Sequence, residues 1–207
     1  MLMLLCSAAL ANAAAPDSTA RVEADWILRA LAQPAPMRTD FVELRGSPML
    51  KAPLRLQGEY RRPDNATLVR EVRDPYVETT TLRQGQASIT RPGKPVRNFA
   101  LSRAPELAQL QTGFGALLSG DRALLETQYR LAAQGTQQQW TLLLTPLDSQ
   151  LKTQLQGITL HGRGEELRCI ETRPAKGDLQ RTLLGSAAKS AATNATTDAL
   201  VSLCHGG

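Results

Sequence analysis

The sequence predicts a mainly β protein with helices, in which about eleven antiparallel strands form one sheet. The hydrophobic period changes from about 3.6 residues to about 2 near Met37, which marks the end of a helix and the start of strands. Turn residues then recur at roughly ten-residue spacing, as in a meander of hairpins. A chain of 207 residues suits one well-buried domain and is short for two.

The first fifteen residues have the composition of a secretory signal peptide. Residues 1–10 are apolar but too few to span a bilayer, and residues 11–15 supply small side chains for a cleavage site. No Lys or Arg precedes the apolar run, which a start codon placed a few residues too late would explain. Cys6 leaves a lipoprotein signal open as an alternative, although Leu5 stands where that signal needs a small residue. We expect export to the periplasm and a soluble mature protein.

A helix and a first set of strands are expected after the signal peptide. Apolar side chains at helical spacing predict a helix over residues 19–32: Val22, Trp26, Ile27 and Leu31. A strand that contains Phe41 follows, and residues 54–61 alternate apolar and polar side chains as a half-buried strand does. Further strands are expected at residues 66–73, 76–82, 87–91 and 96–101.

Residues 103–125 interrupt the strands with apolar side chains at helical spacing: Leu107, Leu110, Phe114, Leu117 and Leu118. Strands are expected again at residues 127–132, 139–145, 153–160, 166–172 and 179–184. The domain is therefore expected to comprise residues 16–184. Residues 185–207 are rich in Ala, Ser, Thr and Asn, so we expect a low-complexity C-terminal tail that is mobile up to residues 198–204.

Composition and motifs favour a binding protein over an enzyme. The net charge of +5 is spread along the chain without a basic run, so no nucleic-acid partner is expected, and attraction to anionic lipid head groups is the better interpretation. His161 and His205 stand in no metal-binding motif, and no phosphate-binding loop or nucleophile elbow is present, so neither a metal nor a cofactor is expected. A nucleophile pair of Cys169 and His161 is a weak interpretation, because antiparallel strands bring many such pairs together by chance.

Two cysteines remain once the signal peptide is removed, Cys169 and Cys204. An even pair in an oxidising compartment predicts a disulfide that ties the C-terminal residues to a strand. The alternative is that one or both are small buried hydrophobic residues.

Several runs of the sequence resemble the LolA-type outer-membrane lipoprotein carriers. Residues 38–41 and 56–63, the second ending in Arg-Arg-Pro, are similar to the opening hairpin of that family. Residues 140–146 look like its strand that ends in Pro, and residues 156–160 with 167–170 look like its paired C-terminal strands. The resemblance implies an unclosed antiparallel β-barrel with a helical lid over the concave face, whose apolar surface holds acyl chains in the periplasm.

The resemblance also gives roles to particular residues. Arg62 matches the family arginine that couples a strand to the lid. Two departures leave the cargo open between lipoproteins, glycolipids and lipid-linked pigments: Glu43 or a neighbour replaces the family's first-strand Gln, and the strand after Gly85 lacks aromatic residues. The expected lining of the cavity comprises Leu54, Leu56, Tyr60, Arg62, Leu68, Phe114, Leu117, Trp140, Leu142 and Leu160.

These features predict a periplasmic carrier that binds acyl chains of lipidated cargo and shuttles it from the inner to the outer membrane. It is expected to act as a monomer between an inner-membrane donor protein and an outer-membrane acceptor protein. The alternative is a lipid-binding sensor of the cell envelope, but a sensor needs a partner-binding domain, and only about twenty residues follow Leu184. A half-barrel with a helix packed inside and no cavity would give the same sequence pattern.

Overall fold

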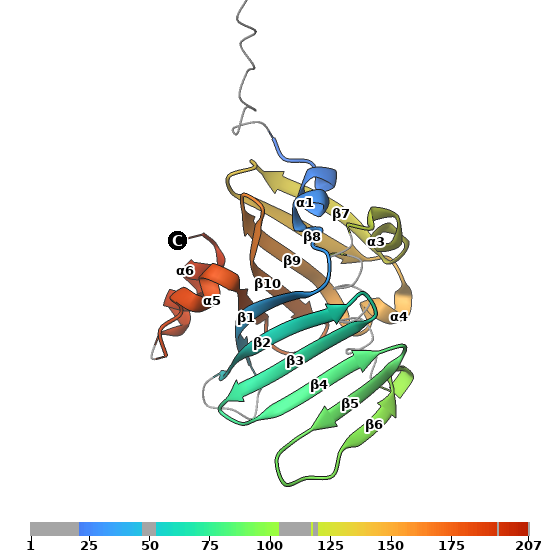
Figure 1. Cartoon of the computed structure of the whole chain (residues 1–207). Coiled ribbons are helices and arrows are strands. Elements are labelled where there is room, and N and C mark those ends of the chain that lie inside the picture. Colours follow the sequence, from blue (N-terminus) through green and yellow to red (C-terminus); the bar gives the residue numbers. More distant parts are fainter. Residues whose placement is uncertain (1–20, 47–52, 104–116, 118–119, 194, 207) are drawn as a thin grey trace, which may run out of the picture.

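The computed structural model describes residues 21–46, 53–103, 117, 120–193 and 195–206. Within these residues, an 11-stranded antiparallel sheet runs in the order β6-β5-β4-β3-β2-β1-β11-β10-β9-β8-β7 (Figure 1). The strands β6 and β7 are its two edges, so the sheet does not close. The predicted mainly β fold with an unclosed antiparallel sheet is confirmed.

Every strand expected from the period of two is present, because alternating side chains satisfy both faces of a sheet at once. The strands are β1 (Met37–Arg45), β2 (Leu54–Asp64), β3 (Thr67–Asp74), β4 (Glu78–Arg83), β5 (Gln86–Thr90), β6 (Arg97–Ala100), β7 (Tyr129–Gly135), β8 (Trp140–Pro146), β9 (Leu155–Arg163), β10 (Glu166–Pro174) and β11 (Gln180–Leu184). The helices are α1 (Ala24–Leu31), the 3-10 helix η1 (Leu101–Arg103), α3 (Arg122–Gln128), α4 (Ser149–Lys152), α5 (Gly185–Ser190) and α6 (Thr197–Cys204).

Helix α1 begins at Ala24, later than the sequence pattern predicts. The two residues at the start of the described chain are extended instead, because they pair with the end of β7. Arg21 forms a β-bridge with Thr136, and the backbone N–H of Val22 donates to the carbonyl oxygen of Gly135 at 3.0 Å. The N-terminal segment is thus fastened to an edge of the sheet before the helix starts.

The two faces of the sheet are covered by different helices, because successive residues of a strand point to opposite faces. We call the face that carries Phe41 the inner face; α1 packs on it, with Ile27 against side chains such as Leu142. We call the face that carries Val42 the outer face; α5 and α6 pack on it, with Ala187 against Val42. Figure 1 shows α1 in front of β8 and β9, and α5 and α6 together beside β10.

The C-terminal segment differs from the mobile tail that its composition predicts. The helices α5 and α6 lie against the outer face of β1, β10 and β11, where Ala187 and Ala188 of α5 and Leu200 of α6 are buried. Small side chains allow α5 to approach the sheet closely, so a segment of low complexity still contributes to the core.

A disulfide fastens this C-terminal segment to the sheet. Cys169 of β10 and Cys204 at the end of α6 are joined with an S–S distance of 2.07 Å and a Cα–Cα distance of 5.0 Å. Both residues belong to the outer-face core, next to Leu183 of β11. The bond closes a loop of 35 residues, which restricts the unfolded chain.

A polar network on the outer face adds a second attachment. The carboxylate of Glu171 in β10 accepts a hydrogen bond from Nε of Arg181 at 2.6 Å, and its oxygens lie 3.3 Å from Nε2 of His161 and 3.2 Å from Nε2 of His205. These contacts, with that of His161 the strongest, lower the pKa of Glu171 to about 2, although partial burial acts in the opposite direction. Since His205 directly follows α6, the network holds the end of that helix on the sheet.

Removing the disulfide is expected to destabilise the protein. A Cys169→Ser, Cys204→Ser double variant should lose about 3 to 4 kcal/mol of unfolding free energy, the value for a loop of this length. Urea unfolding of the wild type with and without reductant measures the loss. Reductant should shift the wild type to the midpoint of the variant and leave the variant unchanged. Equal midpoints for the oxidised wild type and the variant would contradict the prediction.

The Glu171 network is expected to make stability depend on acid pH. The folded state lowers the pKa of this carboxyl, so its contribution is fully present above the ordinary pKa of 4.5 and is lost as the pH falls towards about 2. The Glu171→Gln variant should therefore show a flatter decline of unfolding free energy between pH 5 and pH 2 than the wild type, measured by urea unfolding. Glu165→Gln, which removes an exposed carboxylate nearby, is the control and should follow the wild type.

Candidate functional site

The inner face is a continuous apolar surface made of two clusters. The first cluster lies on β7 to β9 and includes Trp140, Leu142 and Leu160, all nearly fully buried. The second lies on β1 to β5 and β11 and includes Leu56 and Leu82. Leu167 and Ile170 of β10 pack against both clusters, so the two join across the middle of the sheet.

The structure brings the predicted lining residues together on this face. Leu56, Tyr60 and Leu68 are core members of the second cluster, and Leu54 packs against it. The first cluster contains the remaining described ones of the apolar set: Leu117, Trp140, Leu142 and Leu160. Phe114 lies outside the described residues, as does most of the segment for which the lid helix is predicted.

Helix α1 covers only part of the inner face. Ile27, Leu28 and Leu31 are buried in the first cluster. The described members of the second cluster come from strands, apart from Leu101 in η1. The chain between β6 and β7 must join opposite edges of the sheet, and three of its described residues are buried on the inner face, Leu101 in the second cluster and Leu117 and Leu125 in the first. This connection therefore has contacts with both halves of the apolar surface.

A buried charged group, Glu43, lies on the same face as the second cluster; the sequence indicated this residue only as a departure from the family pattern and not as a buried ion pair. The Glu43 side chain is paired with Arg70 at 2.8 Å and with the partly exposed Arg45 at 2.6 Å. The guanidinium of Arg70 also lies 4.8 Å from the ring centroid of Phe41. Burial, together with the Glu43 carboxylate, raises the pKa of Tyr60 to about 12, so its hydroxyl stays protonated. The alternation of side chains along β1 indicates this position, because Glu43 is two residues from Phe41 and therefore points to the same face of the sheet.

Arg62 lies on the same face as Leu56 and Tyr60, at the end of β2, and is buried to all but 6%. Its Nη1 donates to the carbonyl oxygen of Gln33 at 2.9 Å, and its Nη2 donates to Oδ1 of Asn65 at 3.0 Å. Gln33 follows α1, so Arg62 connects the sheet to the segment that leaves this helix. Both acceptors are neutral oxygens.

The side-chain types that ligate metals gather on the outer face, away from this surface. The set comprises His161, Glu171, Cys204 and His205. Cys204 is in the disulfide and offers no thiolate, and Arg181 already donates to the Glu171 carboxylate. The set therefore acts as the attachment of α6 described above. The inner face, in contrast, offers aliphatic side chains with a few hydrogen-bonded polar groups, an arrangement suited to holding hydrocarbon.

A family model described as "Outer membrane lipoprotein carrier protein LolA-like" matches residues 13–207. No curated protein matches the sequence. None of the helices among the described residues is long and apolar enough to cross a membrane.

Three solved structures are similar to the chain at low identity. The LolA superfamily protein NE2245 from Nitrosomonas europaea is 13% identical, with 79% of this chain and 91% of that chain covered and a TM-score of 0.40. A chain of the MucA/MucB complex from Pseudomonas aeruginosa is 20% identical, with 78% and 55% covered and a TM-score of 0.42. LprF from Mycobacterium bovis is 12% identical, with 84% and 96% covered and a TM-score of 0.34.

The chain spans about half the length of the matched chain in the MucA/MucB complex, and nearly all of the other two. The family assignment rests on the sequence model, which extends over almost the whole chain. By this match the chain belongs to the LolA-like family of outer membrane lipoprotein carrier proteins.

Proposed function

We propose that the protein is a periplasmic carrier that holds the acyl chains of lipidated cargo against its inner face and takes this cargo from the inner to the outer membrane. The observation that carries the proposal is the continuous aliphatic inner face, whose first cluster includes residues of α1 and whose second cluster does not. Membership of the LolA-like family and the predicted signal peptide support the same function and location.

The free-energy cost of exposing an acyl chain to water determines how much apolar area a carrier must offer. Each exposed CH₂ of an acyl chain is disfavoured in water by about 0.8 kcal/mol, so a carrier has to offer apolar area comparable to that of the chain. Release requires that the same surface can be covered again by the protein. The connection between β6 and β7, with its contacts to both clusters, and the segment around α1 are the parts of the chain that can serve as such a cover.

Arg62 is the proposed coupling residue between the sheet and this cover. Its two hydrogen bonds link the end of β2 to the segment that follows α1. When cargo displaces α1, the bond to Gln33 breaks, so the position of the helix and the loading of the inner face become linked. A buried arginine bonded only to neutral oxygens can give up one partner more readily than an arginine in an ion pair.

Acyl chains are expected to bind next to Trp140. The chain has two tryptophans, and Trp140 is buried in the first cluster, whereas Trp26 packs at its margin. In a Trp26→Phe variant, brominated fatty acids should therefore quench the remaining fluorescence, while the same fatty acids without bromine should not. Lipid analysis of the protein purified from a native envelope extract should also find bound lipid. A lipid-free protein with unquenched Trp140 would refute the carrier function.

The Arg62→Leu variant is expected to lower the rate of cargo transfer from donor to acceptor membranes about tenfold or more, because it removes hydrogen bonds from a charged group. Transfer of a fluorescent lipopeptide between two vesicle populations measures the rate. Arg61→Leu is the matched control, since Arg61 is on the same strand but lies on the outer face in an ion pair with Glu71. Equal rates for both variants would remove Arg62 from the mechanism. Lipid binding without transfer by the wild type would favour a sensor.

A further inference from the structure

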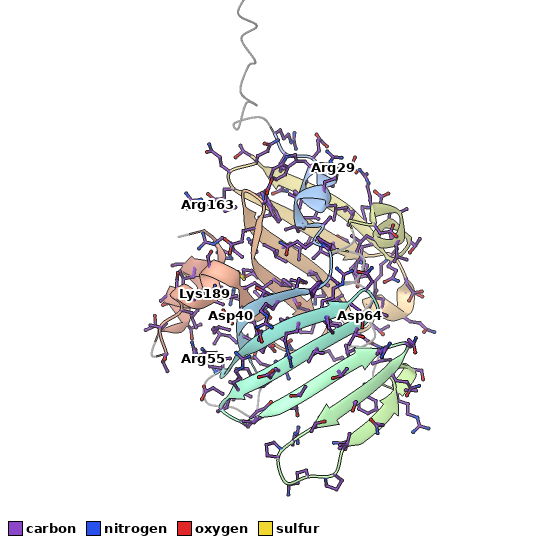
Figure 2. The ribbon with its side chains drawn as sticks, viewed as in Figure 1. Arg29, Asp40, Arg55, Asp64, Arg163 and Lys189 are labelled. Atoms are coloured by element: carbon purple, nitrogen blue, oxygen red, sulfur yellow. A yellow bond between two sulfur atoms is a disulfide. The ribbon has the colours of Figure 1, made fainter. Side chains whose placement is uncertain are left out.

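The outer face carries a cavity of about 280 Å³. It shares one lining residue with the proposed acyl-chain site, Trp140, and its other lining residues lie outside that site. Its lining includes Gln139 before β8, His161 and Arg163 of β9, Arg168 of β10 and His205 after α6. Arg163 projects on the same side of the molecule as Lys189 of α5 (Figure 2). The cavity thus lies where the C-terminal helix meets one half of the sheet.

A β-bulge puts Arg168 and Cys169 on the same face of the sheet. The pairing of β10 with β9 shifts between Leu167 and Cys169, so that Arg168 is an extra residue with no partner on β9. Leu167 packs on the inner face and Cys169 belongs to the outer-face core, with Arg168 between them. The Arg168 side chain lines the cavity with Cys204 and His205.

Arg168 is largely buried, and its Nε–H group has no partner. The residue is 9% exposed, and its Nε has no hydrogen-bond partner. Among the described parts of the chain, no carboxylate forms an ion pair with it. A buried N–H group without an acceptor is disfavoured, because it has lost its hydration without gaining a hydrogen bond. A negatively charged ligand in the cavity would meet a guanidinium whose charge is not paired within the described protein.

The surroundings of Arg168 are rich in donors and lack acids. Arg163 supplies a second guanidinium, and the rings of His161 and His205 line the cavity with their Nε2 atoms at Glu171. None of the described lining residues is acidic. The nearby carboxylate of Glu171 is occupied by Arg181 and the two histidines, so it does not neutralise the arginines of the cavity.

We propose that this cavity binds a phosphate group, with Arg168 as its buried anchor and Arg163 as its second arginine. A guanidinium presents a planar fork of N–H donors that matches two phosphate oxygens, and the second guanidinium serves the others. A metal cation would instead be repelled by Arg163, Arg168 and Arg181. The group belongs either to a soluble phosphate compound or to the head group of a phospholipid.

The wall of the cavity formed by Cys204 and His205 depends on the attachment of α6. The disulfide to Cys169 and the contact of His205 with Glu171 hold this wall in place. The carbonyl oxygen of His205 also accepts a hydrogen bond from Nε2 of Gln139 at 2.9 Å. This wall of the cavity is therefore held in place before a ligand binds.

The test compares thermal unfolding in phosphate and in chloride at equal ionic strength. A ligand that binds only the folded state raises the unfolding temperature. Phosphate should raise it for the wild type and for Arg97→Gln, a control that removes an exposed arginine on the distant edge strand β6. The rise should be absent in Arg168→Gln, which should fold at least as stably as the wild type in chloride because it removes an unpaired buried charge. Equal responses of all three proteins would overturn the proposal.

Two further arms make the result decisive. Arg163→Gln changes the exposed second arginine, and it should weaken phosphate binding about tenfold in a calorimetric titration even if Arg168→Gln does not fold. Co-sedimentation with vesicles of phosphatidylcholine, with and without phosphatidic acid, separates the sources. Binding to phosphatidic acid that is lost in Arg163→Gln identifies a lipid head group, and binding of phosphate alone identifies a soluble ligand. Binding of neither overturns the proposal, whatever the outcome of the Trp140 quenching experiment.

Discussion

The pairing of β1 with β11 is the interaction on which the rest of the structure depends. β1 lies between β2 and β11, so it joins the N-terminal strands to the C-terminal ones, and Phe41 faces Leu184 across this seam while Val42 faces Leu183. The first of these pairs makes the inner face continuous, and the second gives α5 and α6 a surface to pack on. Without this long-range pairing the two sets of strands would be separate meanders, each with an uncovered edge.

The pairing of β1 with β11 makes both faces of the sheet continuous, and the two faces differ in their chemistry. The inner face is aliphatic and suits a ligand that is held by the exclusion of water, which is not directional and so does not select between acyl chains. The outer face is fixed by a covalent bond and by charged hydrogen bonds, which are directional and hold α6 in one position. For the carrier function proposed above, such a fixed opposite side would keep the register of the sheet while the inner cover opens.

The charged groups on the inner face limit how it can be used. The pair of Glu43 and Arg70 is satisfied within the protein, so it adds a fixed polar point to an otherwise apolar surface. Arg62 differs, because its partners are a backbone carbonyl and an amide oxygen. The ion pair of Glu43 and Arg70 favours a single register of β1 to β3, whereas the hydrogen bonds of Arg62 link the sheet to a neighbouring segment. Cargo with a polar head near its acyl chains would contact the pair of Glu43 and Arg70.

The sequence by itself determined the strands, their turns, the apolar inner positions and the cysteine pair, because period and spacing are local properties. Tertiary structure decided what local pattern does not encode. The helices α5 and α6 form in a segment whose composition predicts mobility, because the outer face of β1, β10 and β11 receives them. Helix α1 starts late because Val22 pairs with β7. Arg168 and Cys169 lie on the same face because one bulge interrupts the alternation, and only the pairing of β9 with β10 fixes where that bulge falls.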